Sequence, residues 1–161
     1  MLKKIILTLS LSLCLIAVPC TAMASVPQSD TIISIEILEN GDYIETIIED
    51  TDTGISDISS FSTTKSITKI KRTNYKNASG DILWYVAITA TFSYNGSTSK
   101  CTSCSHSASA PASNWTIKSV SSSKSENSAT AKAVATFHTI GKTTDYSKSV
   151  TITCSPSGIV S

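Results

Sequence analysis

The stretch Ile82–Tyr94, ILWYVAITATFSY, decides the fold. Every second residue in it is apolar, beginning with Ile82 and Trp84 and ending with Phe92 and Tyr94. Successive side chains of a β-strand point to opposite faces of the sheet, so a period of two indicates a strand with one buried face. We therefore expect a long strand whose even-numbered side chains, Trp84 included, form the centre of the core.

Alternating segments separated by turn residues continue after this strand. Apolar residues again occupy every second position from Ala129 to Phe137. The many Ser and Thr residues of this half disfavour helix interiors. Short strands joined by turns are typical of antiparallel sandwiches, so we predict an all-β, Ig-like antiparallel β-sandwich of about seven strands. Its main strands are expected at 66–75, 82–94, 97–106, 115–122, 129–139 and 146–154.

The N-terminal part contains a hairpin signal. Ile33, Ile35 and Ile37 alternate with polar residues, and Asn40-Gly41 then separates them from a second isoleucine-containing run. Asn-Gly between β-branched runs favours a type I′ turn, in which both residues have positive φ. An isolated two-stranded hairpin is marginal in water, so this one is expected to dock elsewhere, to pair with another chain or to stay disordered.

Charge divides the chain near residues 58–64. Residues 25–64 hold nine acidic residues and no basic one, whereas residues 65–161 hold eleven basic and three acidic residues. Such an asymmetry suggests a boundary, and the serine- and threonine-rich segment there is typical of a linker. The expected organisation is a signal peptide at 1–24, an acidic segment with hairpin and linker at 25–64, and a β-sandwich domain at 65–161.

The first 24 residues have the features of a secretory signal. Lys3 and Lys4 precede the apolar stretch 5–18, and Ala22-Met23-Ala24 supplies small residues for a signal peptidase. Fourteen apolar residues span about 21 Å as a helix, short of a roughly 30 Å hydrocarbon core. We expect cleavage before Ser25, a secreted or loosely cell-surface-associated product, and no transmembrane segment after cleavage.

Three cysteines remain after cleavage, an odd number for an oxidising compartment. Cys101 and Cys154 each lie at or just after the end of a β run, so we predict a disulfide between them. Cys104 is then a free or intermolecular thiol, or it competes with Cys101 for Cys154. The Cys101-x-x-Cys104 spacing is also found in redox-active pairs and in zinc sites, and His106 could be a further zinc ligand. A redox-active pair needs a helix after a strand, and that context is missing here. A zinc site needs a second close pair of ligands, which is also missing, so no metal is expected.

Composition argues against enzymatic and nucleic-acid functions. After cleavage the chain has 11 basic and 12 acidic residues, so no nucleic-acid partner is expected. The two histidines, His106 and His138, are not accompanied by a Gly-x-Ser-x-Gly elbow, and only three scattered acids follow residue 65. We therefore expect no catalytic residues, no enzymatic activity and no cofactor.

A basic cluster is one candidate binding surface. It comprises Lys65, Lys69, Lys71 and Arg72 and extends to Lys76; at strand spacing the first three lysines share one face. Three interpretations are open. The cluster contacts anionic cell-wall polymers or lipid headgroups, or it is a solvated edge strand protected from aggregation, or it docks the acidic segment of the same chain.

The two tryptophans are the other candidates. Trp84 lies in the apolar row and is expected in the core, whereas Trp115 begins a strand after a loop and is a candidate ligand contact. Together they would form a platform for a sugar ring.

A resemblance rests on five places in the chain: Leu38–Glu49, Thr73–Trp84, Thr91–Ser97, Cys101 and Thr151–Ser155. They are similar to a family of small uncharacterised secreted proteins of Gram-positive bacteria, mostly clostridial and bacillar. The resemblance covers nearly all of the chain after the signal. It implies export, the turns, a core tryptophan and pairing of Cys101 with Cys154, while Cys104 departs from the family pattern. It implies no activity.

Together these features predict a secreted, non-enzymatic β-sandwich that binds an extracellular or cell-envelope ligand. Its expected partner is an anionic cell-wall polymer or another extracellular protein. The alternative is a secreted effector or bacteriocin-like protein in which residues 25–64 are an acidic pro-segment.

Overall fold

The computed structural model describes residues 30–51 and 64–161, and the regular structure in these ranges is entirely β-strand. The predicted signal peptide, its cleavage site and the predicted linker up to residue 63 lie outside the described residues. Within the described ranges there is no helix that is long and apolar enough to cross a membrane. The strands are β1 (Thr31–Ile37), β2 (Tyr43–Asp50), β3 (Lys65–Lys76), β4 (Ile82–Tyr94), β5 (Ser99–Ser109), β6 (Trp115–Ser125), β7 (Ser128–Thr139) and β8 (Lys142–Thr153).

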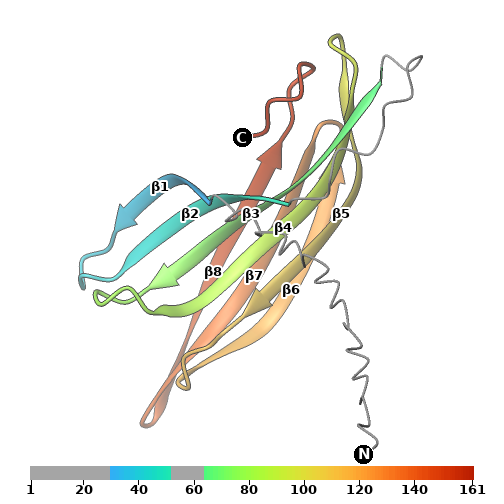
Figure 1. The fold of residues 1–161 in the computed structure, drawn as a ribbon. Coiled ribbons are helices and arrows are strands. Elements are labelled where there is room, and N and C mark those ends of the chain that lie inside the picture. Colours follow the sequence, from blue (N-terminus) through green and yellow to red (C-terminus); the bar gives the residue numbers. More distant parts are fainter. Residues whose placement is uncertain (1–29, 52–63) are drawn as a thin grey trace, which may run out of the picture.

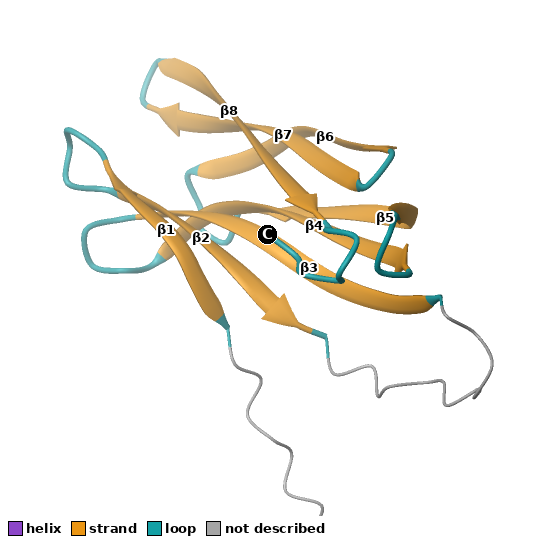
Figure 2. Cartoon of the chain, turned by 90° about the horizontal axis from the view of Figure 1, so that it is seen from above, coloured by secondary structure: helices purple, strands orange, loops and turns teal. Residues whose placement is uncertain are grey.

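The strands form two antiparallel sheets that pack face to face (Figure 1). Sheet A has the order β1-β2-β3-β4-β5 and sheet B the order β6-β7-β8. Figure 2 shows the two layers, in which sheet B packs on β3, β4 and β5. The predicted antiparallel β-sandwich is confirmed. Within each sheet every strand pairs with its neighbours in sequence, so each sheet is a meander and not the Greek key of immunoglobulin domains.

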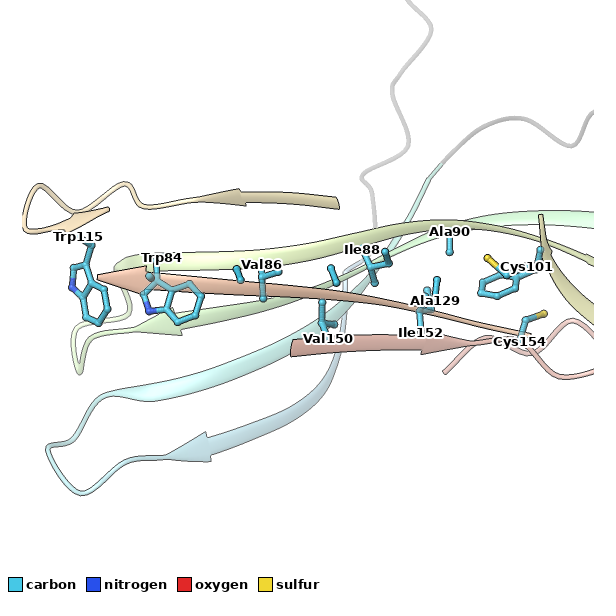
Figure 3. Packing of buried hydrophobic residues seen from close by; sticks show 14 residues of the cluster. Trp84, Val86, Ile88, Ala90, Cys101, Trp115, Ala129, Val150, Ile152 and Cys154 are labelled. Atoms are coloured by element: carbon cyan, nitrogen blue, oxygen red, sulfur yellow. The ribbon is translucent and has the colours of Figure 1, made fainter. Parts of the chain in front are cut away.

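Two alternating rows build the core between the sheets (Figure 3). The inward-facing residues of β4 from Trp84 to Phe92 are at most 2% exposed, and the four alanines of β7 from Ala129 to Ala135 are at most 1% exposed. The small side chains of β7 and the large ones of β4 thus belong to one buried cluster between the sheets. Both predicted rows, and the core position of Trp84, are confirmed.

The predicted N-terminal hairpin forms as β1 and β2 and is docked as part of sheet A. Strand β2 pairs with β3 along its whole length, from Tyr43 opposite Lys76 to Asp50 opposite Lys69. The sheet is therefore continuous across the charge boundary. Strand β1 lies at the edge, where its isoleucines are exposed, and the irregular spacing of these isoleucines coincides with a bulge after Ile32.

The turn between β1 and β2 is not the predicted type I′ turn. Gly41 N donates to Leu38 O at 3.0 Å, and Leu38 N donates to Asp42 O at 2.8 Å. Gly41 has a φ of 85°, whereas Glu126 is the one described non-glycine residue with positive φ, so Asn40 does not share that conformation. This pattern is a type I turn followed by a left-handed glycine. Asn40 acts through its side chain instead, donating from Nδ2 to Asp42 Oδ2 at 2.8 Å.

Candidate functional site

An aromatic cluster occupies one end of the sandwich, where both sheets place rings on their inner faces. Sheet A contributes Tyr75 and Trp84, which are cross-strand partners on β3 and β4. Sheet B contributes Trp115, Phe137 and Tyr146, one from each of its strands. The centroid of the Trp115 ring lies 4.9 Å from the ring centroid of Phe137, 5.1 Å from that of Tyr146 and 5.4 Å from that of Tyr75. Contacts at these separations stabilise aromatic pairs beyond the burial of their area.

Four rings of this cluster, all except Trp84, line a cavity of about 220 Å³, which we call the aromatic pocket. Trp115 is only 6% exposed, whereas Tyr146 is 36% exposed and so remains open to solvent. The pocket combines aromatic rings with polar side chains, among them one acid and two amides. Its lining residues are Asn40, Asp42, Tyr75, Leu83, Asn114, Trp115, Phe137 and Tyr146.

Asp42 is fixed at the rim of the aromatic pocket by its turn. Its backbone amide donates to Asn40 Oδ1 at 3.2 Å, and its Oδ2 accepts from Asn40 Nδ2. Burial, and then the nearby charge of Asp42, raise the pKa of the Tyr75 hydroxyl, with a smaller contribution from Tyr146 in the same direction. The carboxylate therefore acts electrostatically on the aromatic floor.

Trp115 is the one predicted ligand contact that lies in this pocket. Sequence reasoning missed Tyr75, Phe137 and Tyr146 because each lies on a different strand. The sequence did contain a clue to the cluster, because its aromatic residues lie alternately near the end of one strand and near the start of another. In an antiparallel meander such positions gather at one end of the sandwich.

The predicted basic cluster lies on β3, which is an interior strand of sheet A, so the edge-strand interpretation is wrong. Arg72 Nη2 lies 2.8 Å from Glu49 Oε1, and Lys69 forms a salt bridge with Asp50. Both acids belong to β2. The cluster therefore docks the acidic segment of the same chain, which is the third interpretation.

The remaining lysines of the cluster differ in their surroundings. Lys65, Lys69 and Lys71 share the inner face of β3, as predicted, opposite Tyr94, Ala90 and Ile88 of β4. Lys65 is exposed, whereas burial lowers the pKa of Lys71. Among the described residues neither Lys65 nor Lys71 forms a salt bridge, so an anion contact here stays a prediction.

The fold is expected to lose stability in acid because the carboxylate of Glu45 on β2 becomes protonated. Burial raises the pKa of Glu45, but hydrogen bonds from Lys76 (2.6 Å) and Asn74 (3.2 Å) outweigh it, and the net pKa lies below the ordinary 4.5. A carboxyl with a depressed folded-state pKa stabilises the fold above its unfolded-state pKa, and this contribution disappears as the pH falls through the folded-state value. Urea unfolding of Glu45→Gln between about pH 5 and pH 2 is expected to show a weaker loss of stability than the wild type.

Lys76→Met gives the partner test, because it removes the main hydrogen bond that lowers the Glu45 pKa. It should also weaken the acid-dependent loss. If the pH dependence of stability is unchanged in both variants, Glu45 is not a source of the loss of stability in acid.

The three cysteines within the described residues, Cys101, Cys104 and Cys154, do not line the aromatic pocket. Figure 3 shows Cys101 and Cys154 at the end of the core opposite Trp84 and Trp115. All three cysteines are free thiols in this structure, so the predicted Cys101–Cys154 disulfide is not formed in it. In this state Cys101 Sγ donates to Ser103 O at 3.3 Å, and Cys154 Sγ donates to Ser155 O at 3.4 Å. Each thiol faces a carbonyl of its own segment.

The thiols do not have the features of a redox-active pair. Burial raises the pKa of both Cys101 and Cys154, and the neighbouring Cys104 raises that of Cys101 further. A raised pKa leaves less of the nucleophilic thiolate at neutral pH, the reverse of what a thioredoxin-like motif requires. Within residues 30–51 and 64–161, no group of three His, Cys, Asp or Glu side chains is arranged to hold a metal ion.

The two histidines occupy exposed positions and bind neighbouring hydroxyls. His106 Nδ1 lies 2.8 Å from Ser122 Oγ, and His138 Nε2 lies 2.8 Å from Thr116 Oγ1. The first contact joins β5 of sheet A to β6 of sheet B.

Comparison of the chain with protein-family models, with curated proteins and with solved structures found no match. The class of the protein therefore rests on its own fold and site. It is an all-β sandwich of two antiparallel sheets with an aromatic pocket at one end.

Proposed function

We propose that the protein is a secreted, non-enzymatic β-sandwich that binds a small extracellular or cell-envelope ligand in the aromatic pocket. The observation that supports this most is the half-open aromatic floor around Trp115, bordered by a fixed carboxylate and two amides. Such pockets place a ligand by apolar contact and orient it with few polar groups. Export is supported by the signal-like residues 1–24 and by the resemblance to secreted proteins of Gram-positive bacteria.

The alternative, in which residues 25–64 are removed as a pro-segment, has less support. Removal would take β1 and β2 out of sheet A and turn β3 into an unpaired edge. Exposed edges of this kind favour aggregation. It would also leave Lys69 and Arg72 without the acids that now neutralise them.

We also propose that the secreted form joins Cys101 to Cys154. Both backbone amides are held by the β6–β7 turn, because Cys101 N donates to Glu126 O at 2.7 Å and Cys154 N donates to Asn127 O at 3.0 Å. The backbone carbonyls of the consecutive residues Glu126 and Asn127 thus hold the two cysteine segments side by side. An oxidising compartment favours the crosslink.

Tyr146→Ala is expected to reduce retention on Gram-positive cell envelopes by about tenfold, the size of loss seen when a contacting aromatic anchor is removed. Tyr146 suits this test because it lines the pocket and is partly exposed, so the fold should survive. The measurement is the fraction of purified protein that co-sediments with envelopes. Ile140→Ala is the control, since Ile140 is fully exposed at the β7–β8 turn. Equal retention of both variants would contradict a role of the pocket.

A further inference from the structure

The aromatic pocket has a charge character that narrows its ligand. Its eight lining residues include one acid, Asp42, and no lysine, arginine or histidine. The acid is held in place by Asn40 through two hydrogen bonds. Anionic ligands are therefore disfavoured here, although the chain carries many lysines elsewhere.

The floor presents three rings that are tilted against one another. The ring planes make angles of 44° between Tyr75 and Trp115, 54° between Trp115 and Tyr146, and 62° between Tyr75 and Tyr146. All three rings line the pocket, so a ligand there meets aromatic edges and faces. Organic cations are attracted to such faces because the quadrupole of an aromatic ring is negative above its plane.

The polar side chains of the pocket are one acid, two amides and two tyrosine hydroxyls. A pyranose ring presents several hydroxyls, each of which needs a partner when it leaves water. Of the two amides in the lining, the Asn40 side chain is already engaged with Asp42, which leaves the Asn114 side chain. An alkylated ammonium group asks for little hydrogen bonding, because its methyl groups pack on apolar surface and its charge needs only a nearby carboxylate.

We infer that the aromatic pocket binds a small organic cation, a quaternary or alkylated ammonium headgroup, with its methyl groups on Tyr75, Trp115 and Tyr146 and its charge balanced by Asp42. The cavity of about 220 Å³ is smaller than the sites of drug-sized ligands, in keeping with a single headgroup. This inference rests on the proposed function, since it names the ligand class of the same pocket.

The test uses the protein's own fluorescence, because the chain has two tryptophans and both belong to the aromatic cluster. Choline chloride and its neutral tert-butyl analogue are titrated at matched ionic strength. The neutral analogue has the same shape without the charge. It is expected to bind about tenfold more weakly, as is choline to Asp42→Asn.

The chain offers a matched control for the acid. Asn77 and Asp81 form the same Asn–Asp contact in the β3–β4 turn, with Asn77 Nδ2 donating to Asp81 Oδ2 at 3.0 Å, and neither residue lines the pocket. Asp81→Asn should leave choline affinity unchanged. Thermal unfolding of both variants shows whether each is folded.

Two outcomes would overturn the inference. One is equal affinity for choline and its neutral analogue, or no response to choline at all. The other is an equal effect of Asp42→Asn and Asp81→Asn. If an uncharged glycan instead changes the fluorescence and Tyr146→Ala abolishes that change, the cation is excluded while the proposed function stands. The envelope-retention experiment with Tyr146→Ala decides the proposed function separately.

Discussion

Replacing Phe92 by alanine is expected to lower the free energy of unfolding by about 3–5 kcal/mol. Phe92 is fully buried and is the largest side chain of the core that has no measurable exposure. It lies opposite Cys101 on β5, close to where β4 ends. Truncation would remove buried apolar area and leave a cavity that the two paired sheets can only partly close. Both terms destabilise the fold.

Urea unfolding at neutral pH measures this loss. Thr89→Ala is the matched control, because Thr89 lies on the same strand but points to the outer face and is only partly buried. It should change stability by less than about 0.5 kcal/mol. A similar cost for the two variants would mean that the alternation of β4 does not define the core.

Period-two patterning explains why most of the fold could be predicted. Strand β4 has the bounds expected from Ile82 and Tyr94, because one face of it meets a second sheet and every second position had to be apolar. Strand β8 begins earlier than expected, at Lys142, since its first residues are polar and become strand only by pairing with β7. Pairing is a tertiary effect, and local composition does not reveal it.

The charge asymmetry had two interpretations, a boundary in the chain and docking of the acidic segment on the basic cluster, and the salt bridges between β2 and β3 match the second. The change of sign near Lys65 looks like a boundary between domains, yet it marks two strands that lie side by side in one sheet. Opposite charges on neighbouring strands stabilise their pairing, as Arg72 with Glu49 and Lys76 with Glu45 show. The aromatic pocket was missed for a related reason, since its residues meet only when both sheets are assembled.

Oxidation that joins Cys101 to Cys154 is expected to raise the free energy of unfolding by about 4 kcal/mol. The crosslink would close a loop of roughly 53 residues and so remove conformational entropy from the unfolded chain. The cysteines come from opposite sheets, Cys101 from β5 and Cys154 from the residue after β8, and both are at most 2% exposed. The bond would therefore tie the two layers together at the end of the core opposite the aromatic cluster.

The reaction is thiol–disulfide exchange with a small disulfide such as oxidised glutathione, which takes up the two electrons and releases two thiols. Stability of the oxidised chain is compared with that of the same chain in dithiothreitol, and peptide mapping identifies the linked residues. Cys104→Ser should retain the full difference, because Cys104 is the spare thiol. Cys154→Ser should lose it. A crosslink that runs through Cys104, or a stabilisation below about 1 kcal/mol, would show that the β6–β7 turn does not bring Cys101 and Cys154 within reach of each other.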